Sequence, residues 1–120
     1  MREKKIYEAC ERLLTVCSHC KEDENILIVT DEESMDMGMA LWDAAERFPN
    51  RTLVLMNPRK MHGEEPTDLV AAAMLKADVI FRATTFSLSH SYARRRACEA
   101  GARDLNSVSY THLRAHETRR

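Results

Sequence analysis

The chain has 120 residues, 44% of them hydrophobic and 31% charged, with a net charge of -1 at pH 7. This length permits one small core, and the near-neutral charge gives no reason to expect a nucleic-acid partner. Because no apolar stretch reaches the roughly 18 to 20 residues that cross a bilayer, and the start lacks the apolar core of a signal peptide, we expect no membrane partner and a cytoplasmic location.

The first predicted element is an amphipathic helix over residues 2–18, where apolar side chains recur at helical spacing. Cys10 and Cys17 lie on this apolar stripe. Cys17 and Cys20 also have the C-x-x-C spacing at which two thiolates can meet one tetrahedral metal ion. No second ligand pair follows at finger-like spacing, so we favour packing of free thiols over zinc or redox chemistry.

Short apolar runs bounded by polar residues then alternate with segments of helical periodicity. The runs predict strands at residues 26–30, 52–56 and 78–81. The periodic segments predict helices over residues 34–48 and 66–76, and a last helix that follows the third strand and ends at Ala100. Ser87 or Ser89 is available to cap this last helix, and Gly101 suits its left-handed end.

Strands separated by helices pair in parallel, with right-handed crossovers. The predicted fold class is therefore α/β, a Rossmann-like three-layer sandwich with three parallel strands and four helices. The predicted strands start at residues 26, 52 and 78, a regular step that predicts a fourth strand near residue 104. The sequence there is polar and lacks a buried-strand run, so we expect the fold to be truncated before that strand.

The segment after residue 103 contains SYTHLRAHET, which resembles a translated sequencing-adapter or vector sequence. We therefore expect an incomplete N-terminal α/β domain at residues 1–103, followed by a non-native, disordered tail at residues 104–120.

Ligands of an open parallel sheet bind beyond the carboxyl ends of its strands. Thr85, Ser89 and His90 follow the third predicted strand, and they place hydroxyls and an imidazole around a helix N-terminus whose free N–H groups could bind a carboxylate or another anion. Capping of the helix is an equally good reading. The sequence around these serines has no G-x-S-x-G elbow, so a serine hydrolase is not indicated.

Two further clusters precede these residues at the same edge. The acidic segment Asp31–Glu33 lacks a G-x-G-x-x-G motif and would repel a phosphate, so we expect it to complement a helix dipole. His62, Glu64 and Glu65 could hold a metal or move a proton. We favour the simpler reading, in which Glu64 or Glu65 is the acidic start of the next helix.

The strings ILIVTDEE, MHGEEP and TTFSLSHSYARRRACEAGAR resemble the N-terminal domain of the leucyl aminopeptidase (aminopeptidase T) family, whose relatives include 2,5-dihydroxypyridine 5,6-dioxygenase. The resemblance covers residues 1–103. It implies a two-domain metallo-aminopeptidase, a hydrolase whose C-terminal part carries the metal ligands. We therefore expect no catalytic residue, metal ligand or cofactor on this chain, and a divalent metal in the full-length protein.

On this interpretation the chain is inactive alone and forms one wall of a cleft for a peptide or small-molecule substrate, with a homodimer as an option. The expected substrate-binding residues are Thr85, Ser89, His90 and His62. Two alternatives remain open: a small-ligand module that binds an anion or carboxylate, and the N-terminal domain of a ring-cleaving dioxygenase relative.

Overall fold

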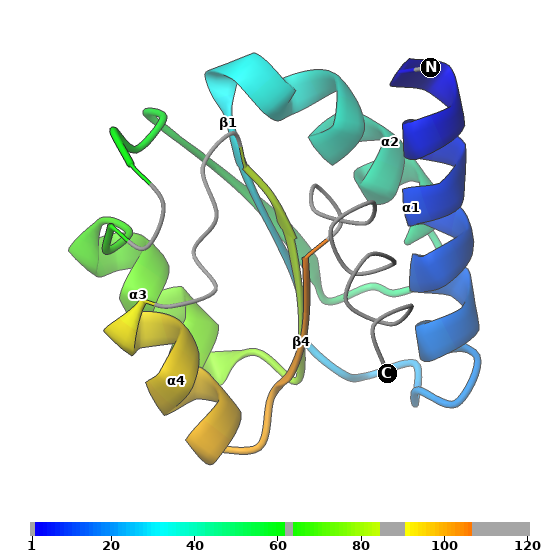
Figure 1. Cartoon of the computed structure of the whole chain (residues 1–120). Coiled ribbons are helices and arrows are strands. Elements are labelled where there is room, and N and C mark those ends of the chain that lie inside the picture. Colours follow the sequence, from blue (N-terminus) through cyan, green and yellow to red (C-terminus); the bar gives the residue numbers. More distant parts are fainter. Residues whose placement is uncertain (1, 62–63, 85–90, 107–120) are drawn as a thin grey trace, which may run out of the picture.

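The middle layer of the protein is a parallel sheet, seen in a computed structural model that describes residues 2–61, 64–84 and 91–106 (Figure 1). The strands lie in the order β2-β1-β3-β4. Their bounds are β1 (Ile26–Asp31), β2 (Arg51–Met56), β3 (Val79–Ala83) and β4 (Arg103–Asn106). The helices are α1 (Arg2–Cys17), the 3-10 turn η1 (Glu32–Ser34), α2 (Met35–Ala44), α3 (Asp68–Lys76) and α4 (Tyr92–Glu99).

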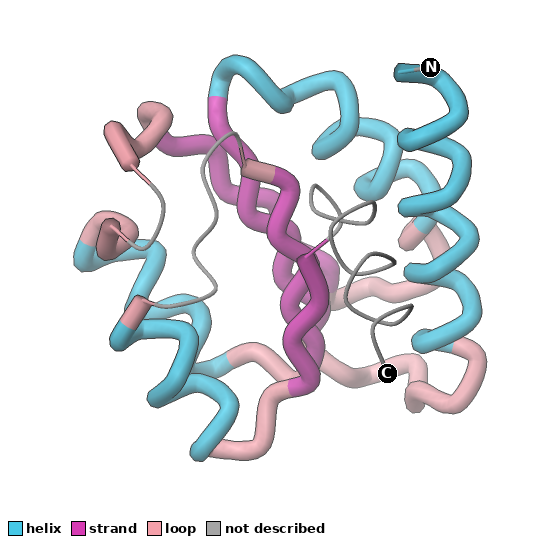
Figure 2. Tube along the Cα trace, in the orientation of Figure 1, coloured by secondary structure: helices cyan, strands magenta, loops and turns pink. Residues whose placement is uncertain are grey.

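Helices cover both faces of the sheet, so the molecule has three layers (Figure 2). Ile28 of β1 and Phe81 of β3 face the core formed with α1 and α2, whereas Val29 and Ile80 face the core formed with α3 and α4. β1 is buried along its whole length and pairs with both β2 and β3. Burial on both faces explains why β1 and β3 read as continuous apolar runs. The predicted α/β class and its four helices are confirmed.

The prediction of three strands is wrong, because β4 pairs in parallel with β3 at the position expected for a fourth strand. The sequence did not reveal β4 because three of its four residues are polar. Leu105 packs against the α1 and α2 core, while the Asp104 carboxylate lies between two guanidinium groups on the opposite face. The Nε atoms of Arg82 and Arg94 donate to its two oxygens at 2.7 and 2.8 Å. Ion pairs thus replace the apolar run that a buried strand normally shows.

The ends of the helices follow ordinary capping chemistry. The Ser91 hydroxyl accepts from the Arg94 N–H at 3.2 Å and caps α4. The prediction that Ser87 or Ser89 caps this helix is therefore wrong, and both of these serines lie outside the described residues. Gly101 follows α4 with a φ of 109°, which confirms the predicted left-handed end. Thr67 caps α3 in the same way as Ser91 caps α4, accepting from Val70 N–H at 3.3 Å.

Candidate functional site at the carboxyl edge of the sheet

The strand order reverses between β1 and β3, because the chain leaves β1 toward β2 on one side and later returns to β3 on the other. In open α/β sheets the crevice at such a reversal is the usual ligand site. Thr30 and Asp31 end β1 there, and Thr84 directly follows β3; all three are buried. Buried polar residues thus mark this point of the edge.

Hydrogen bonds fix the backbone around the reversal. The Thr30 hydroxyl lies 2.8 Å from the Ala83 carbonyl oxygen and so links the ends of β1 and β3. The Asp31 carboxylate accepts from the Ser34 N–H at 2.9 Å and caps η1. Helix α2 also comes very close, since a Cβ added to Gly38 would lie 2.8 Å from the Thr30 side chain. The segment that starts at Asp31 is therefore held tightly against the sheet.

The N-terminus of α4 already holds a carboxylate. Glu65, from the loop before α3, accepts from the Tyr92 N–H at 2.5 Å and from the Ala93 N–H at 3.1 Å. The reading of Glu65 as the acidic start of α3 is therefore wrong: that first turn contains Asp68 instead. Free N–H groups at this helix start were the basis of the expected anion site. Two of them are used by the chain itself.

The neighbouring Glu64 organises its own loop. Its Oε1 accepts from the Lys60 N–H at 2.6 Å, and its Oε2 lies 3.9 Å from Nη1 of Arg59. Arg59 also donates from Nη2 to the Asn57 carbonyl oxygen at 3.2 Å. These contacts tie Glu64 to residues 57–60, directly after β2, at the same edge as the ends of β1 and β3.

Negative charge predominates along the part of this edge that follows β1. Its carboxylates belong to Asp31, Glu32, Glu33 and Asp36, and the sequence has no Lys or Arg from residue 31 to residue 46. Glu32, Glu33 and Asp36 are exposed. The positive charge nearest the end of β3, on Arg82, is paired with Asp104. The exposed charge that follows β1 therefore favours a cationic ligand group over an anionic one at this part of the edge.

Comparisons with protein-family models, with curated proteins and with solved structures gave no match.

The substrate-binding residues expected from the sequence, Thr85, Ser89, His90 and His62, all lie outside the described residues. Sequence reasoning placed Asp31 and Glu65 at this edge but did not predict their contacts. Asp31 is the last residue of the buried strand β1, and a carboxylate at that position was a usable signal for a site at the reversal. Glu65 lies 27 residues from Tyr92 in the chain, so nothing local could have indicated their contact.

Within residues 2–61, 64–84 and 91–106, no three His, Cys, Asp or Glu side chains are grouped so that they could hold a metal ion. Across the same residues, no helix has the length and apolar character that a bilayer crossing requires.

Proposed function

We propose that this chain is the N-terminal α/β domain of a metal-dependent leucyl aminopeptidase-like protein, in which it forms one wall of the substrate cleft. The family comes from the resemblance over residues 1–103. The observation that supports it is the acidic segment after β1, beside the reversal of strand order, which contains Glu32, Glu33 and Asp36. An aminopeptidase substrate carries a free α-ammonium group, and clustered carboxylates attract such a group.

The resemblance implies that the C-terminal part of such an enzyme holds the divalent metal, so the proposal places no metal ligand on this chain. No catalytic step is assigned to the chain. In this proposal it is cytoplasmic and inactive alone, and it contributes charge and shape to one side of the cleft. Thr85, Ser89 and His90 continue the chain from Thr84 and are proposed to contact the substrate.

The proposal can be tested by titrating the isotope-labelled chain with leucinamide, which has a free ammonium group, and with N-acetyl-leucinamide, which lacks it. Leucinamide should shift the amide resonances of residues 31–36 at millimolar concentration, and the acetylated compound should not. Glu33→Gln should weaken the response because it removes one exposed carboxylate. Glu46→Gln is the matched control, since Glu46 is also exposed but follows the far end of α2.

Two results would contradict this reading. Equal shifts with both compounds would show that the ammonium group is not recognised. Shifts confined to the start of α4, produced by simple carboxylates, would favour the alternative of an anion-binding module, although Glu65 already occupies two amide groups there. A domain from a ring-cleaving dioxygenase relative would have no reason to distinguish the two compounds by charge.

A second measurement addresses the metal. Leucine p-nitroanilide should not be hydrolysed by the chain alone in the presence of zinc, cobalt or manganese. Robust turnover that follows the purified chain through chromatography would overturn the placement of the metal ligands outside it.

A further inference from the structure

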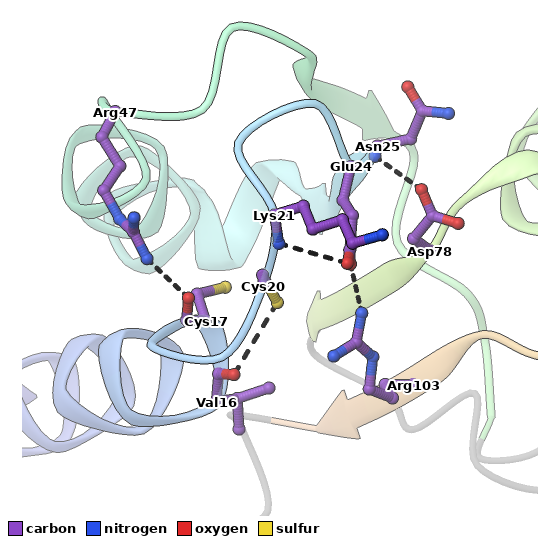
Figure 3. A network of polar contacts seen from close by, with 9 residues as sticks. All are labelled: Val16, Cys17, Cys20, Lys21, Glu24, Asn25, Arg47, Asp78 and Arg103. Atoms are coloured by element: carbon purple, nitrogen blue, oxygen red, sulfur yellow. Dashed lines mark hydrogen bonds and ion pairs between the residues drawn. The ribbon is translucent and has the colours of Figure 1, made fainter.

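Two cysteines meet at the opposite, amino edge of the sheet (Figure 3). Cys17 is the last residue of α1, and Cys20 ends the turn that follows. The Cys20 N–H donates to the Cys17 carbonyl oxygen at 3.0 Å, which closes a tight turn. Cα atoms three residues apart in such a turn lie within about 7 Å, and disulfides require about 4.4 to 6.8 Å. The backbone therefore already holds the two residues near the separation that a disulfide needs.

The Cys20 side chain folds back against the last turn of α1. Its Sγ lies 3.7 Å from the carbonyl oxygen of Val16, the residue before Cys17 (Figure 3). Both cysteines are free thiols. Their exposure differs, since Cys17 is fully buried in the core while Cys20 is only partly buried. A small molecule from solvent can thus reach Cys20 but not Cys17.

We propose that Cys17 and Cys20 form a reversible redox site, in which a low-molecular-weight disulfide such as glutathione disulfide oxidises the pair to an intramolecular disulfide. The Cys20 thiolate attacks one sulfur of glutathione disulfide, the sulfur–sulfur bond breaks, and one glutathione thiolate leaves. Cys17 then loses its proton and attacks the Cys20 sulfur, releasing the second glutathione. The two cysteines lose two electrons and two protons, and the products are two molecules of reduced glutathione.

The order of attack follows from the surroundings of the two sulfurs. Burial raises the pKa of the Cys17 thiol to about 12, and the neighbouring Cys20 adds to the rise. A thiol in this state is a poor nucleophile at neutral pH, because the thiolate is the reacting form. Cys20 is therefore the residue that meets the oxidant, and Cys17 closes the ring.

The turn that carries the pair is tied to three other parts of the fold (Figure 3). Arg47, after α2, donates from Nη2 to the Cys17 carbonyl oxygen at 2.5 Å. Glu24 accepts from the Lys21 N–H at 3.2 Å and pairs with Arg103 of β4. Asp78, next to β3, accepts from the Asn25 N–H at 2.8 Å. Oxidation would therefore stiffen a junction between α1, the end of α2 and the amino ends of β3 and β4.

The test uses three chains in glutathione buffers of increasing oxidised fraction. The natural chain is compared with Cys10→Ala/Cys98→Ala, which keeps only the pair, and with Cys10→Ala/Cys17→Ala/Cys98→Ala, which keeps only Cys20. In the pair-only chain, mass spectrometry should show loss of two hydrogens with no glutathione adduct, reversed by reduced glutathione. The Cys20-only chain should stop at the mixed disulfide. Closure of the ring should accelerate about tenfold per pH unit, because Cys17 must ionise.

A stable glutathione adduct on Cys20 in the pair-only chain would overturn the proposal. The proposal would also fail if the pair-only chain stayed reduced in a glutathione buffer that fully modifies the Cys20-only chain. Peptide mapping of the oxidised natural chain gives the same answer if the variants fail to fold, since a Cys17–Cys20 crosslink must be found there. None of these results depends on the ligand at the carboxyl edge, so this inference and the proposed function can fail separately.

Discussion

Gly38 of α2 lies against the Thr30 side chain of β1. A Cβ at this position would lie 2.8 Å from three atoms of the Thr30 side chain. Helix propensity alone predicts that Gly38→Ala stabilises the protein by about 1 kcal/mol. We expect the opposite sign, a loss of about 1 to 3 kcal/mol, because the added methyl group overpacks a rigid contact. Urea unfolding measures the difference.

Two comparisons isolate this clash. Met39→Ala changes the next, exposed residue of α2 and should have little effect. Thr30→Ser removes one of the contacted atoms, so combining it with Gly38→Ala should recover part of the loss. A stabilised Gly38→Ala protein would mean that α2 can move away from the sheet at no cost.

Cys17 should make the protein less stable at alkaline pH. Burial raises its pKa from the ordinary value of 9.0 to about 12 in the folded chain. Below pH 9 both states carry the thiol, so Cys17 adds no pH dependence. Between these two values the unfolded chain loses the proton while the folded chain keeps it, so stability falls as pH rises, by up to about 1.4 kcal/mol per pH unit.

The measurement is the free energy of unfolding as a function of pH under reducing conditions. Cys17→Ala should flatten the decline relative to the natural chain, whatever its effect on absolute stability. Cys98→Ala should keep the decline. Parallel curves for the natural chain and Cys17→Ala would show that the buried thiol does not contribute to it.

At the scale of the element, α4 depends on a residue from another loop. Glu65 accepts hydrogen bonds from the first two N–H groups of the helix, and such caps contribute about 0.5 to 2 kcal/mol. Glu65→Gln should therefore increase hydrogen exchange of the α4 amides while α3 stays protected. Thr67→Ala is the reciprocal control, because it removes the cap of α3. Equal loss of protection in both helices would point to global unfolding instead of local fraying.

Strand β4 depends on its carboxylate. The Asp104 side chain is 1% exposed and is shared by Arg82, which is 4% exposed, and Arg94, which is 39% exposed. We expect Asp104→Ala to cost about 3 to 5 kcal/mol, because it leaves a buried guanidinium group without this partner. Glu24→Gln removes the other carboxylate paired with β4, at a more exposed site, and should cost less than about 1 kcal/mol. Similar losses of thermal stability in Asp104→Ala and Glu24→Gln would contradict the role of burial.

At the scale of the whole molecule, β2 forms one edge of the described sheet. Leu55 near its end is 50% exposed, and together with the exposed Leu69 of α3 it lines a groove of about 430 Å³. Exposed apolar edges promote association between chains. Leu55→Lys should reduce concentration-dependent association in sedimentation experiments without lowering the thermal midpoint. Leu14→Lys, on the exposed side of α1, should leave association unchanged if the β2 edge is responsible.

The sequence predicts the layers of this fold well, because burial on both faces of β1 and β3 imposes continuous apolar runs that a reader can recognise. It fails at β4, where Asp104 is stabilised by charges that come from β3 and α4. The spacing of the strands located β4 correctly even though its composition did not identify it.

The site is harder to predict from sequence, since it depends on contacts between distant residues. The approach of Glu65 to Tyr92 is set by how α3 and α4 pack on the sheet, and neither local periodicity nor charge pattern encodes it. Asp31 could be placed at the ligand edge, because it follows a recognisable strand. The link from Thr30 to Ala83 required the strand order, which alternation of strands and helices does not determine.

Glu65 competes with any free carboxylate for the first two N–H groups of α4. A group that the folded chain holds against its own site acts at an effective concentration in the millimolar range or above. A free carboxylate at micromolar concentration should therefore not displace Glu65 from the Tyr92 and Ala93 N–H groups. On the proposed function, we expect this helix start to discriminate against the acidic end of a small molecule.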